Sequence, residues 1–295
     1  IARKPKLTSF GLGLLKRRLD GVPLILDIED WELGLMYANW SRNRAPIAGL
    51  PRLIDFNSYY YTRGLESRTD LADAITVSNT FLQDKFGGTL IPHVRDMNDF
   101  DPSRYDSSTI RKRYDLPEEA ILVAFIGTPR PHKGVRELVE AVSKLDSNVY
   151  VLVVGADDSD YVKNLKEYGG DTVILVDPQP FEKIPEWVAT ADVVASPQKQ
   201  VQGLHGQIPA KIFDGMAMGK PIVATAISDI PELIDGCGIV IDEPSPLAIK
   251  QALSSLIDDS DLRHSMGKRA REVAIDRFSV AQHERIFENI LDNVA

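Results

Sequence analysis

The sequence has a single cysteine, Cys237, among 295 residues. One cysteine excludes an intramolecular disulfide framework and any zinc or iron–sulfur site built from several thiolates, and it is typical of a reducing compartment. Positive charge is also scarce, since 34 Lys and Arg stand against 43 Asp and Glu and give a formal net charge of -9. This balance disfavours a nucleic acid as partner. No apolar run approaches the ~20 residues that are needed to span a bilayer.

Apolar residues make up 43% of the chain, which is enough for two domains with large buried cores. Between residues 121 and 242, short β-branched runs alternate with helical patterns, which predicts a parallel α/β domain with strands buried on both faces. The predicted strands are Ile121–Gly127, Val149–Gly155, Thr172–Asp177, Asp192–Pro197, Pro221–Ala226 and Gly238–Asp242. Such sheets bind ligands beyond the carboxyl ends of their strands, so the chemistry is expected in the loops that follow them.

Helical periodicity marks segments that cover this sheet. Val135, Leu138, Val139 and Val142 recur at i, i+3, i+4 and i+7, so one helical face packs on the strands. Further helices are predicted at Ala210–Met218, Pro246–Asp258 and Asp261–Phe278.

The first hundred residues contain less sheet. The predicted strands there are Val22–Ile28, Ala74–Val77 and Thr89–Ile91, and the predicted helices are Phe10–Leu19, Leu50–Tyr61 and Thr80–Phe86. Two or three short strands bury too little of a parallel sheet, which usually needs four or more. Together with a start at Ile1 rather than Met, this predicts the rear part of a longer first domain.

A cationic loop follows the strand that ends at Gly127. It runs GTPRPHKG and delivers Arg130, His132 and Lys133 to the start of the next helix at Gly134. Unpaired amides and the positive dipole end at a helix start make such a loop suited to a phosphate. A solvated basic turn is an equally good interpretation of the spacing alone.

A second cluster runs from residue 198 to residue 221. Its front half is polar, and backbone amides near Gly203 and Gly206 can approach a ligand closely. Its back half is a predicted helix on which Lys211 and Asp214 share one face. A carboxylate at this position is the usual acceptor for ribose hydroxyls, although an ordinary charge near a helix start explains it as well.

Several stretches match one known pattern in order and spacing. They are Gly127 with Lys133-Gly134, ADVVASP at 191–197, FDGMAMGKPIVAT at 213–225 and IPELI at 230–234, with LADAITVS at 71–78 and IPH at 91–93 upstream. Together they resemble the family-4, or group 1, nucleotide-sugar glycosyltransferases of GT-B fold, over nearly the whole chain. The resemblance implies a retaining transfer of a sugar from a nucleoside diphosphate sugar to an acceptor hydroxyl, with no metal and no cofactor.

The resemblance also assigns residues, because fixed cations stabilise the charge that builds on the leaving diphosphate. Lys133 falls on the family's diphosphate lysine, and Arg130 substitutes for an arginine that the family has at Thr128. Asp214 falls on the second acid of a paired-glutamate motif and is expected to hold the ribose hydroxyls. The residues assigned to donor binding are Gly127, Thr128, Gly134, His205, Gly206, Gln207, Lys211 and Asp214.

Gly206 is a departure from the family, which has its first glutamate at this position. His205 and Gln207 are the neighbours expected to supply sugar contacts instead. The variant Pro209-Ala-Lys211 resembles a subgroup that often works on surface polysaccharides.

Two Rossmann-like α/β domains that face a cleft are therefore expected. Residues 1–94 form the rear part of the N-terminal, acceptor-side domain, and residues 95–108 form a linker. Residues 109–278 form the nucleotide-sugar-binding domain, and residues 279–295 form a helix that packs back on the first domain.

An acidic stretch, LDIEDWE at 26–32, follows a predicted strand of the first domain. Glu29 stands where the family commonly has a His, and Asp30 follows it. Either carboxylate can accept a hydrogen bond from a sugar hydroxyl or act as general base on the acceptor. Both are assigned as catalytic, with Arg130 and Lys133, although a solvated acidic turn explains them as well.

Near the start, basic residues surround apolar ones in an amphipathic pattern that suits an anionic membrane surface. The basic residues are Arg3, Lys4, Lys6, Lys16, Arg17 and Arg18. An ordinary surface helix is the alternative. Lipid-linked acceptors are frequent in the family, so the expected location is cytoplasmic, with peripheral contact at the inner face of a membrane.

Two other functions stay open. A nucleotide-sugar epimerase or a phosphorylase uses the same scaffold, but needs further acids or a pyridoxal-phosphate lysine. A non-catalytic or partner-dependent nucleotide-sugar-binding protein is favoured by Gly206 and by the small first domain. The expected partners are a nucleotide-sugar donor and a carbohydrate, lipid-linked or small-molecule acceptor.

Overall fold

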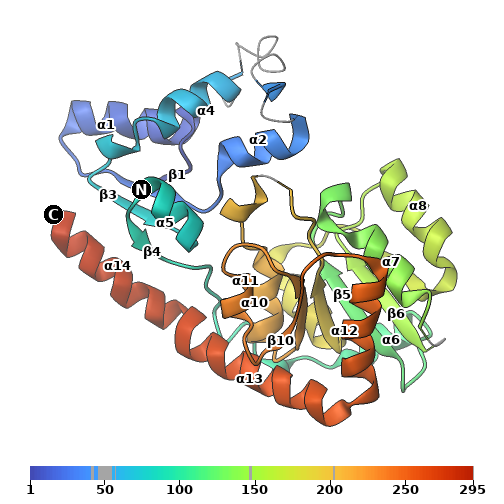
Figure 1. The fold of residues 1–295 in the computed structure, drawn as a ribbon. Coiled ribbons are helices and arrows are strands. Elements are labelled where there is room, and N and C mark those ends of the chain that lie inside the picture. The colour runs from blue at the N-terminus through green and yellow to red at the C-terminus, as the bar shows by residue number, and fades with distance from the viewer. Residues whose placement is uncertain (41–42, 46–54, 57, 146–147, 202, 295) are drawn as a thin grey trace.

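The computed structural model describes residues 1–40, 43–45, 55–56, 58–145, 148–201 and 203–294. It contains two sheets of parallel strands, and each sheet has its own helices. The smaller sheet and its helices lie at the upper left in Figure 1, and the larger sheet lies at the lower right. The larger sheet has the strand order β10-β9-β8-β5-β6-β7 and the smaller has β1-β2-β3-β4.

The six-stranded sheet confirms all six strands predicted for it, each within one residue at either end. The strands are β5 (Ile121–Ile126), β6 (Val149–Val154), β7 (Val173–Val176), β8 (Val193–Ser196), β9 (Ile222–Thr225) and β10 (Gly238–Ile241). All their pairings are parallel. On β5, Leu122 and Ala124 enter one core while Val123 and Phe125 enter the other, which is why its sequence is apolar throughout.

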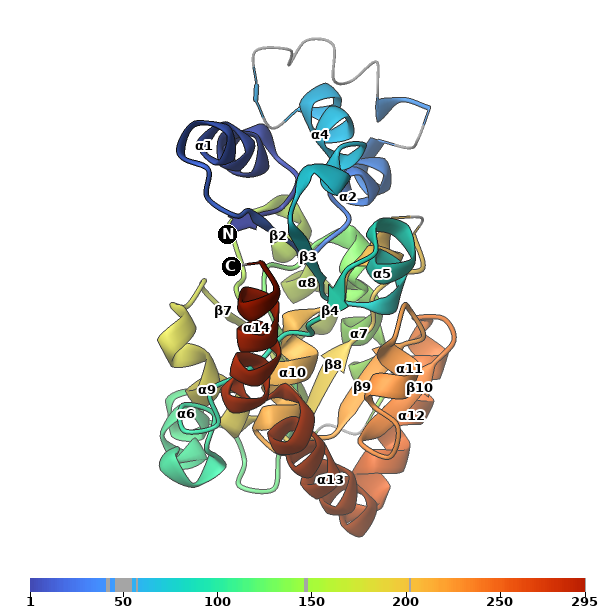
Figure 2. The ribbon, with the colours of Figure 1, turned by 90° about the vertical axis from the view of Figure 1, so that its left-hand side faces the viewer.

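Helices cover both faces of this sheet (Figure 2). One layer contains α7 (Val135–Val142), α8 (Asp160–Gly169) and α12 (Pro246–Asp258), and the other contains α6 (Ser107–Arg113), α9 (Ile184–Thr190), α10 (Ala210–Ala217) and α13 (Ser260–Phe278). The predicted helices at α7, α10, α12 and α13 are confirmed. One-turn helices lie at Thr69–Leu71, Pro102–Arg104, Pro131–Lys133, Gly170–Thr172, Phe181–Lys183 and Leu204–Gly206.

The four-stranded sheet is also parallel. Its strands are β1 (Ala2–Arg3), β2 (Ile25–Ile28), β3 (Ala74–Val77) and β4 (Thr89–Leu90), and its helices are α1 (Leu12–Asp20), α2 (Glu32–Trp40), α4 (Tyr59–Glu66) and α5 (Thr80–Phe86). A π-helical turn at Leu7–Gly11 precedes α1. The sequence analysis missed β1, because two residues carry no periodicity. The helix predicted at 50–61 falls mostly outside the described residues, and α4 begins at Tyr59.

The segment predicted as a linker, 95–108, is more ordered than its polar sequence indicates. Phe100 is buried in a core of the larger domain, and α6 begins at Ser107. Arg95 pairs with Ser279 in a parallel bridge, so the chain crosses between the domains twice at one place. Beyond it, α14 (Val280–Val294) runs along the smaller sheet, where Ile290 packs with Ile25 and Ile91 (Figure 1).

Glu66, the last residue of α4, connects two elements of the smaller domain. Its carboxylate accepts hydrogen bonds from the Leu33 amide at 3.1 Å and from Trp31 Nε1 at 3.2 Å. Burial raises the pKa of Glu66 from its ordinary 4.5 to about 7. The folded chain therefore keeps a proton there that the unfolded chain loses at lower pH, and its stability falls as pH rises from 4.5 to 7.

We expect Glu66→Gln to remove this pH dependence. Urea unfolding should show the variant more stable than the native chain at pH 8 by about 1–3 kcal/mol, with a smaller advantage at pH 5. Glu288→Gln, at an exposed position on α14, is the control. An equal difference at both pH values would contradict the assignment.

Candidate functional site

The loop after β5 brings the cationic residues to the edge of the sheet that faces the smaller domain. Gly134 closes the loop with φ +70°, and a Cβ on it would lie 1.7 Å from the carbonyl oxygen of Pro197, which follows β8. Only glycine fits this approach. The start of α7 is therefore pressed against the end of β8, next to the loop that carries the second predicted cluster.

Lys133 and Arg130 point to different partners in this loop. Lys133 is half-buried and donates from Nζ to the Thr128 carbonyl oxygen at 2.9 Å. Burial and nearby Arg130 lower the pKa of Lys133. Arg130 is 44% exposed and donates from Nη1 to Asp157 Oδ2 at 2.7 Å. The ion pair therefore holds Arg130 toward the end of β6.

Lys211 adds a second cation to the same region. Its side chain is buried on α10, and Nζ lies 4.4 Å from the centroid of the Phe125 ring. Burial and, to a smaller extent, Lys133 lower the pKa of Lys211 to about 7, while Asp214 opposes the shift. Among the described residues, Lys211 has no hydrogen-bond or ion-pair partner. An anion bound here would favour the charged forms of both lysines.

Gln198 is a site residue that the sequence analysis did not single out. It follows β8, is buried, and its Nε2 has no hydrogen-bond partner among the described residues. Its neighbour Lys199 donates from its amide to the His132 carbonyl oxygen at 2.8 Å, which ties this loop to the cationic loop. A buried donor without an acceptor is costly, so it is available to a ligand oxygen. A lone glutamine in a polar run gives no sequence signal.

Asp214 lies on α10 and is engaged by the crossover between the domains. Arg95 donates from Nε to Asp214 Oδ1 and from Nη2 to the Ala210 carbonyl oxygen at 3.1 Å. Burial raises the pKa of Asp214, while Arg95 opposes the shift. Its Oδ2 has no partner among the described residues. Arg95 lies 119 positions away in sequence, so only the fold reveals the pair.

His93 lies two residues before Arg95 and contacts α10 through Phe213. Its ring meets Phe213 edge-on at 5.4 Å between centroids. Burial and Arg95 lower the pKa of His93, while Glu29, Asp30 and Asp214 oppose the shift. The imidazole is therefore mainly neutral at pH 7, and carboxylates of both domains act on it electrostatically. The sequence analysis used this residue only as part of a family motif.

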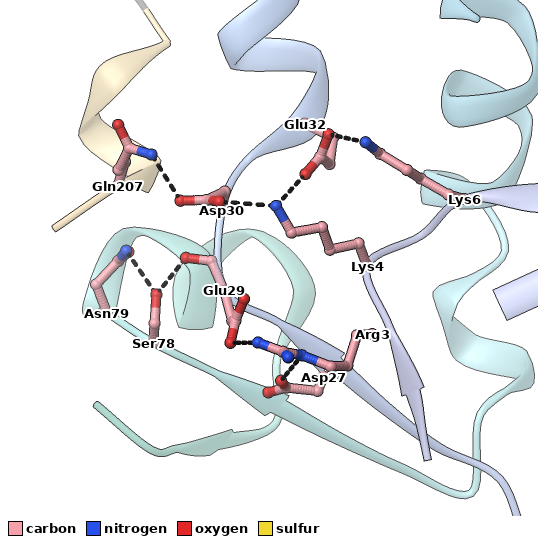
Figure 3. Close-up of polar contacts among 10 residues, drawn as sticks. All are labelled: Arg3, Lys4, Lys6, Asp27, Glu29, Asp30, Glu32, Ser78, Asn79 and Gln207. Atoms are coloured by element: carbon pink, nitrogen blue, oxygen red, sulfur yellow. Dashed lines mark hydrogen bonds and ion pairs between the residues drawn. The ribbon is translucent and has the colours of Figure 1, made fainter. Parts of the chain in front are cut away.

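Gly206, in the larger domain, lies in direct contact with the smaller domain. The Trp31 amide donates to the Gly206 carbonyl oxygen at 3.1 Å, and a Cβ on Gly206 would lie 2.5 Å from the Cβ of Trp31. Next to it, Gln207 donates from Nε2 to Asp30 Oδ1 at 2.9 Å (Figure 3). The absence of a side chain at 206 thus allows the start of α2 to dock on the 203–207 loop.

The predicted catalytic carboxylates are held by cations from the start of the chain (Figure 3). Arg3 pairs with Glu29, and Lys4 Nζ lies 2.9 Å from Asp30 Oδ2. Burial lowers the pKa of Lys4, but Glu32 and Asp30 together outweigh this effect and raise it. Asp30 Oδ2 is paired with Lys4 and Oδ1 accepts a hydrogen bond from Gln207, so this geometry favours a positioning role for Asp30 over proton abstraction.

The structure thus brings some predicted residues together and separates others. Thr128, Lys133 and Lys211 gather at the ends of β5 and β8, and Gln207 meets Asp30 across the cleft. The ring of His205 faces Phe81 instead, with centroids 6.3 Å apart. Among the described residues, no three His, Cys, Asp or Glu side chains are grouped so that they could hold a metal ion.

We expect Gly206→Ala to weaken the contact between the domains. The added Cβ collides with Trp31, so hydrogen exchange at the Trp31 amide should accelerate by roughly tenfold or more. Gly206→Glu, which restores the family residue, should do the same and reduce any sugar-transfer activity. Gly64→Ala is the matched control, because no atom lies within 4 Å of a Cβ there. Unchanged exchange at Trp31 in Gly206→Ala would refute this role.

Comparison with solved structures identifies the fold. The chain superimposes on Anabaena HepE, solved with UDP and glucose, with a TM-score of 0.77 and 20% identity over 98% of this chain and 77% of HepE. It superimposes on WaaG, a glycosyltransferase involved in lipopolysaccharide biosynthesis, with a TM-score of 0.69 and 19% identity over 96% of this chain and 81% of WaaG. The predicted GT-B fold with two α/β domains is confirmed.

Comparison of the amino-acid sequence with known proteins identifies relatives of this chain and the family to which it belongs. The D-inositol 3-phosphate glycosyltransferase of Corynebacterium kroppenstedtii is 29% identical over 67% of this chain and 46% of its own length. The N-acetyl-alpha-D-glucosaminyl L-malate synthase of Bacillus anthracis is 27% identical over 63% and 50%. The chain thus spans about half the length of these relatives. The model of the family "Glycosyl transferases group 1" matches residues 106–273, more than half of the chain, which therefore belongs to this family.

Proposed function

We propose that the chain transfers a sugar, with retention of configuration, from a nucleoside diphosphate sugar to an acceptor hydroxyl. The observation that carries the proposal is the pair of lysines, Lys133 and Lys211, whose pKa values are lowered and which interact electrostatically. The side-chain amide of Gln198, which has no hydrogen-bond partner among the described residues, belongs to the loop that is hydrogen-bonded to the cationic loop through Lys199. A half-buried and a buried cation, together with a buried donor that has no acceptor among the described residues, favour an anionic ligand. A diphosphate supplies that charge and several acceptor oxygens.

In the proposed reaction the bond between sugar C1 and the diphosphate oxygen breaks. The acceptor oxygen forms the new bond to C1, and its hydroxyl proton passes to the leaving diphosphate. Lys133 and Lys211 stabilise the charge that grows on this leaving group, more strongly in the transition state than in the bound donor. The proposal assigns this role to side chains and not to a metal ion, and the retention of configuration is carried over from the family resemblance.

For the nucleotide we propose a uridine diphosphate, since HepE is solved with UDP-glucose. Asp214 is proposed to accept a hydrogen bond from the ribose through Oδ2, because Arg95 occupies Oδ1. Arg130 is removed from the proposed catalytic set, since its guanidinium is engaged by Asp157. A role in surface polysaccharide or glycoconjugate synthesis is supported by the resemblance at Pro209-Ala-Lys211.

Binding without transfer is the second candidate. Gly206 packs against Trp31 and has no carboxylate where the family has its first glutamate. Both Glu29 and Asp30 are in ion pairs. A chain that binds UDP-glucose but releases no UDP with any acceptor would support this candidate and overturn the proposed transfer.

Donor binding should depend on Lys211 and on pH. As pH rises through about 7 the free chain loses the Lys211 charge, so affinity for UDP-glucose should fall between pH 6 and 8.5. Lys211→Met should lower the affinity at pH 6 by roughly tenfold or more and flatten the pH profile, and Lys133→Ala should lower both affinity and transfer.

Isothermal titration calorimetry with UDP-glucose is the measurement, because its diphosphate does not titrate in this range. Lys268→Met, at an exposed position on α13, is the control. Native affinity in both lysine variants would refute the donor site.

We propose membrane contact through α1. None of the helices in the described ranges is long and apolar enough to cross a membrane. Arg3, Lys4 and Lys6 pair with carboxylates of the smaller domain. On α1, Lys16 pairs with Asp20 and Arg17 pairs with Asp73. The remaining candidate is a stripe of exposed Leu12, Leu15 and Leu19 beside Arg18, which suits peripheral contact of a cytoplasmic protein with anionic lipid.

Sedimentation with vesicles tests this contact. The native chain should bind phosphatidylglycerol vesicles better than phosphatidylcholine vesicles, and Leu15→Glu with Leu19→Glu should reduce binding by roughly fivefold or more. Leu247→Glu on α12, where the leucine is 65% exposed, is the matched control. Equal binding by both variants would overturn the proposal.

A further inference from the structure

A cavity of about 740 Å³ lies between the domains, on the side where α5 faces α11 (Ile230–Leu233) (Figures 1 and 2). Residues of both domains line it, and residues 127–134 of the cationic loop do not. It is therefore separate from the lysines of the donor site. Its size suits a ligand of one or two sugar rings.

Aromatic residues line this cavity. Phe81 comes from α5, Phe213 comes from α10, and His205 lies in the loop between β8 and α10. The rings of Phe81 and His205 are tilted by 33° with centroids 6.3 Å apart. Flat apolar faces of this kind are suited to the C–H face of a sugar ring.

Carboxylates and hydroxyls form the polar part of the lining. Asp229 accepts hydrogen bonds from the Thr80 amide at 2.9 Å and from the Thr80 hydroxyl, so this rim joins the two domains. Asp84 and Glu232 are exposed and have no hydrogen-bond or ion-pair partner in the described part of the chain. Carboxylates accept hydrogen bonds only, so they fit a ligand that donates from several hydroxyl groups.

The charge of the lining is opposite to that of the donor site. Asp84, Asp229 and Glu232 carry negative charge, and Arg277 is the one cation among the described lining residues. Its guanidinium lies over the ring of Phe278, 5.2 Å from the centroid. Unpaired carboxylates repel a phosphate or carboxylate on a ligand.

The backbone places the cavity next to the donor site. His205 directly precedes Gly206 and Gln207, and Phe213 directly precedes Asp214. We propose that this cavity is the acceptor subsite and that it selects an uncharged, polyhydroxylated acceptor over a phosphorylated one. The inference rests on the proposed glycosyl transfer, which requires an acceptor beside the donor.

Methyl α-D-glucopyranoside and glucose 6-phosphate are the probes for this inference. Saturation-transfer NMR on the whole chain in the presence of UDP should detect the glycoside in the site and not the phosphate. Phe81→Ala should weaken glycoside binding by roughly fivefold or more, because the cavity loses the apolar face of this ring.

A charge-neutralising pair of changes tests the same idea at exposed positions that leave the fold intact. Asp84→Asn with Glu232→Gln should weaken binding of the glycoside by roughly threefold and should allow glucose 6-phosphate to bind. Glu119→Gln is the control, at an exposed position just before β5 begins. It should change neither glycoside binding nor phosphate binding.

Four outcomes are decisive. Binding of the phosphate as tightly as the glycoside by the native chain would overturn the inference, and so would glycoside binding that survives both variants. UDP binding without glycoside binding overturns the acceptor subsite and leaves the donor site standing. Glycoside binding with no affinity for UDP supports the cavity as a sugar site and overturns the proposed transfer.

Discussion

The buried ion pair between Arg95 and Asp214 fixes the geometry on which the cleft depends. Arg95 lies at the crossover, where its amide donates to the Phe278 carbonyl oxygen and its own carbonyl oxygen accepts from the Val280 amide. Loss of one partner from such a pair leaves an uncompensated buried charge and typically costs about 3–5 kcal/mol. The pair ties both crossing segments of the chain to α10, which carries Lys211. The position of the proposed donor site and the relation between the domains are therefore set together.

Pairing of charges, and not their number, separates the two sides of the cleft. On the smaller domain, Arg3 and Lys4 are neutralised by Glu29 and Asp30, which makes this side a rigid polar network. On the larger domain, Lys133 and Lys211 have no ion pair with a carboxylate in the described part of the chain, and their pKa values are lowered. Buried cations without counter-charges reduce stability, and a bound anion would remove that cost.

The sequence predicted the larger domain well, because strands buried on both faces are continuous apolar runs and their helices repeat every 3.6 residues. The smaller domain was predicted less well, since β1 has two residues and is recognisable only by its pairing with β2. Lys133 and Asp214 were predicted as site residues from the order of motifs along the chain. Arg95 and Gln198 were not, because a single polar residue in a polar segment has no pattern of its own.

The sequence by itself determined the parallel α/β architecture, the loops where chemistry is expected and the cations that enter them, since these follow from periodicity and from residue order. Only the tertiary structure decided which charges remain unpaired and why Gly206 is a glycine. The reason is that Trp31 and Gly206 lie 175 positions apart in the chain yet meet through a backbone hydrogen bond. Contacts of this kind depend on how two domains dock, which local sequence does not encode.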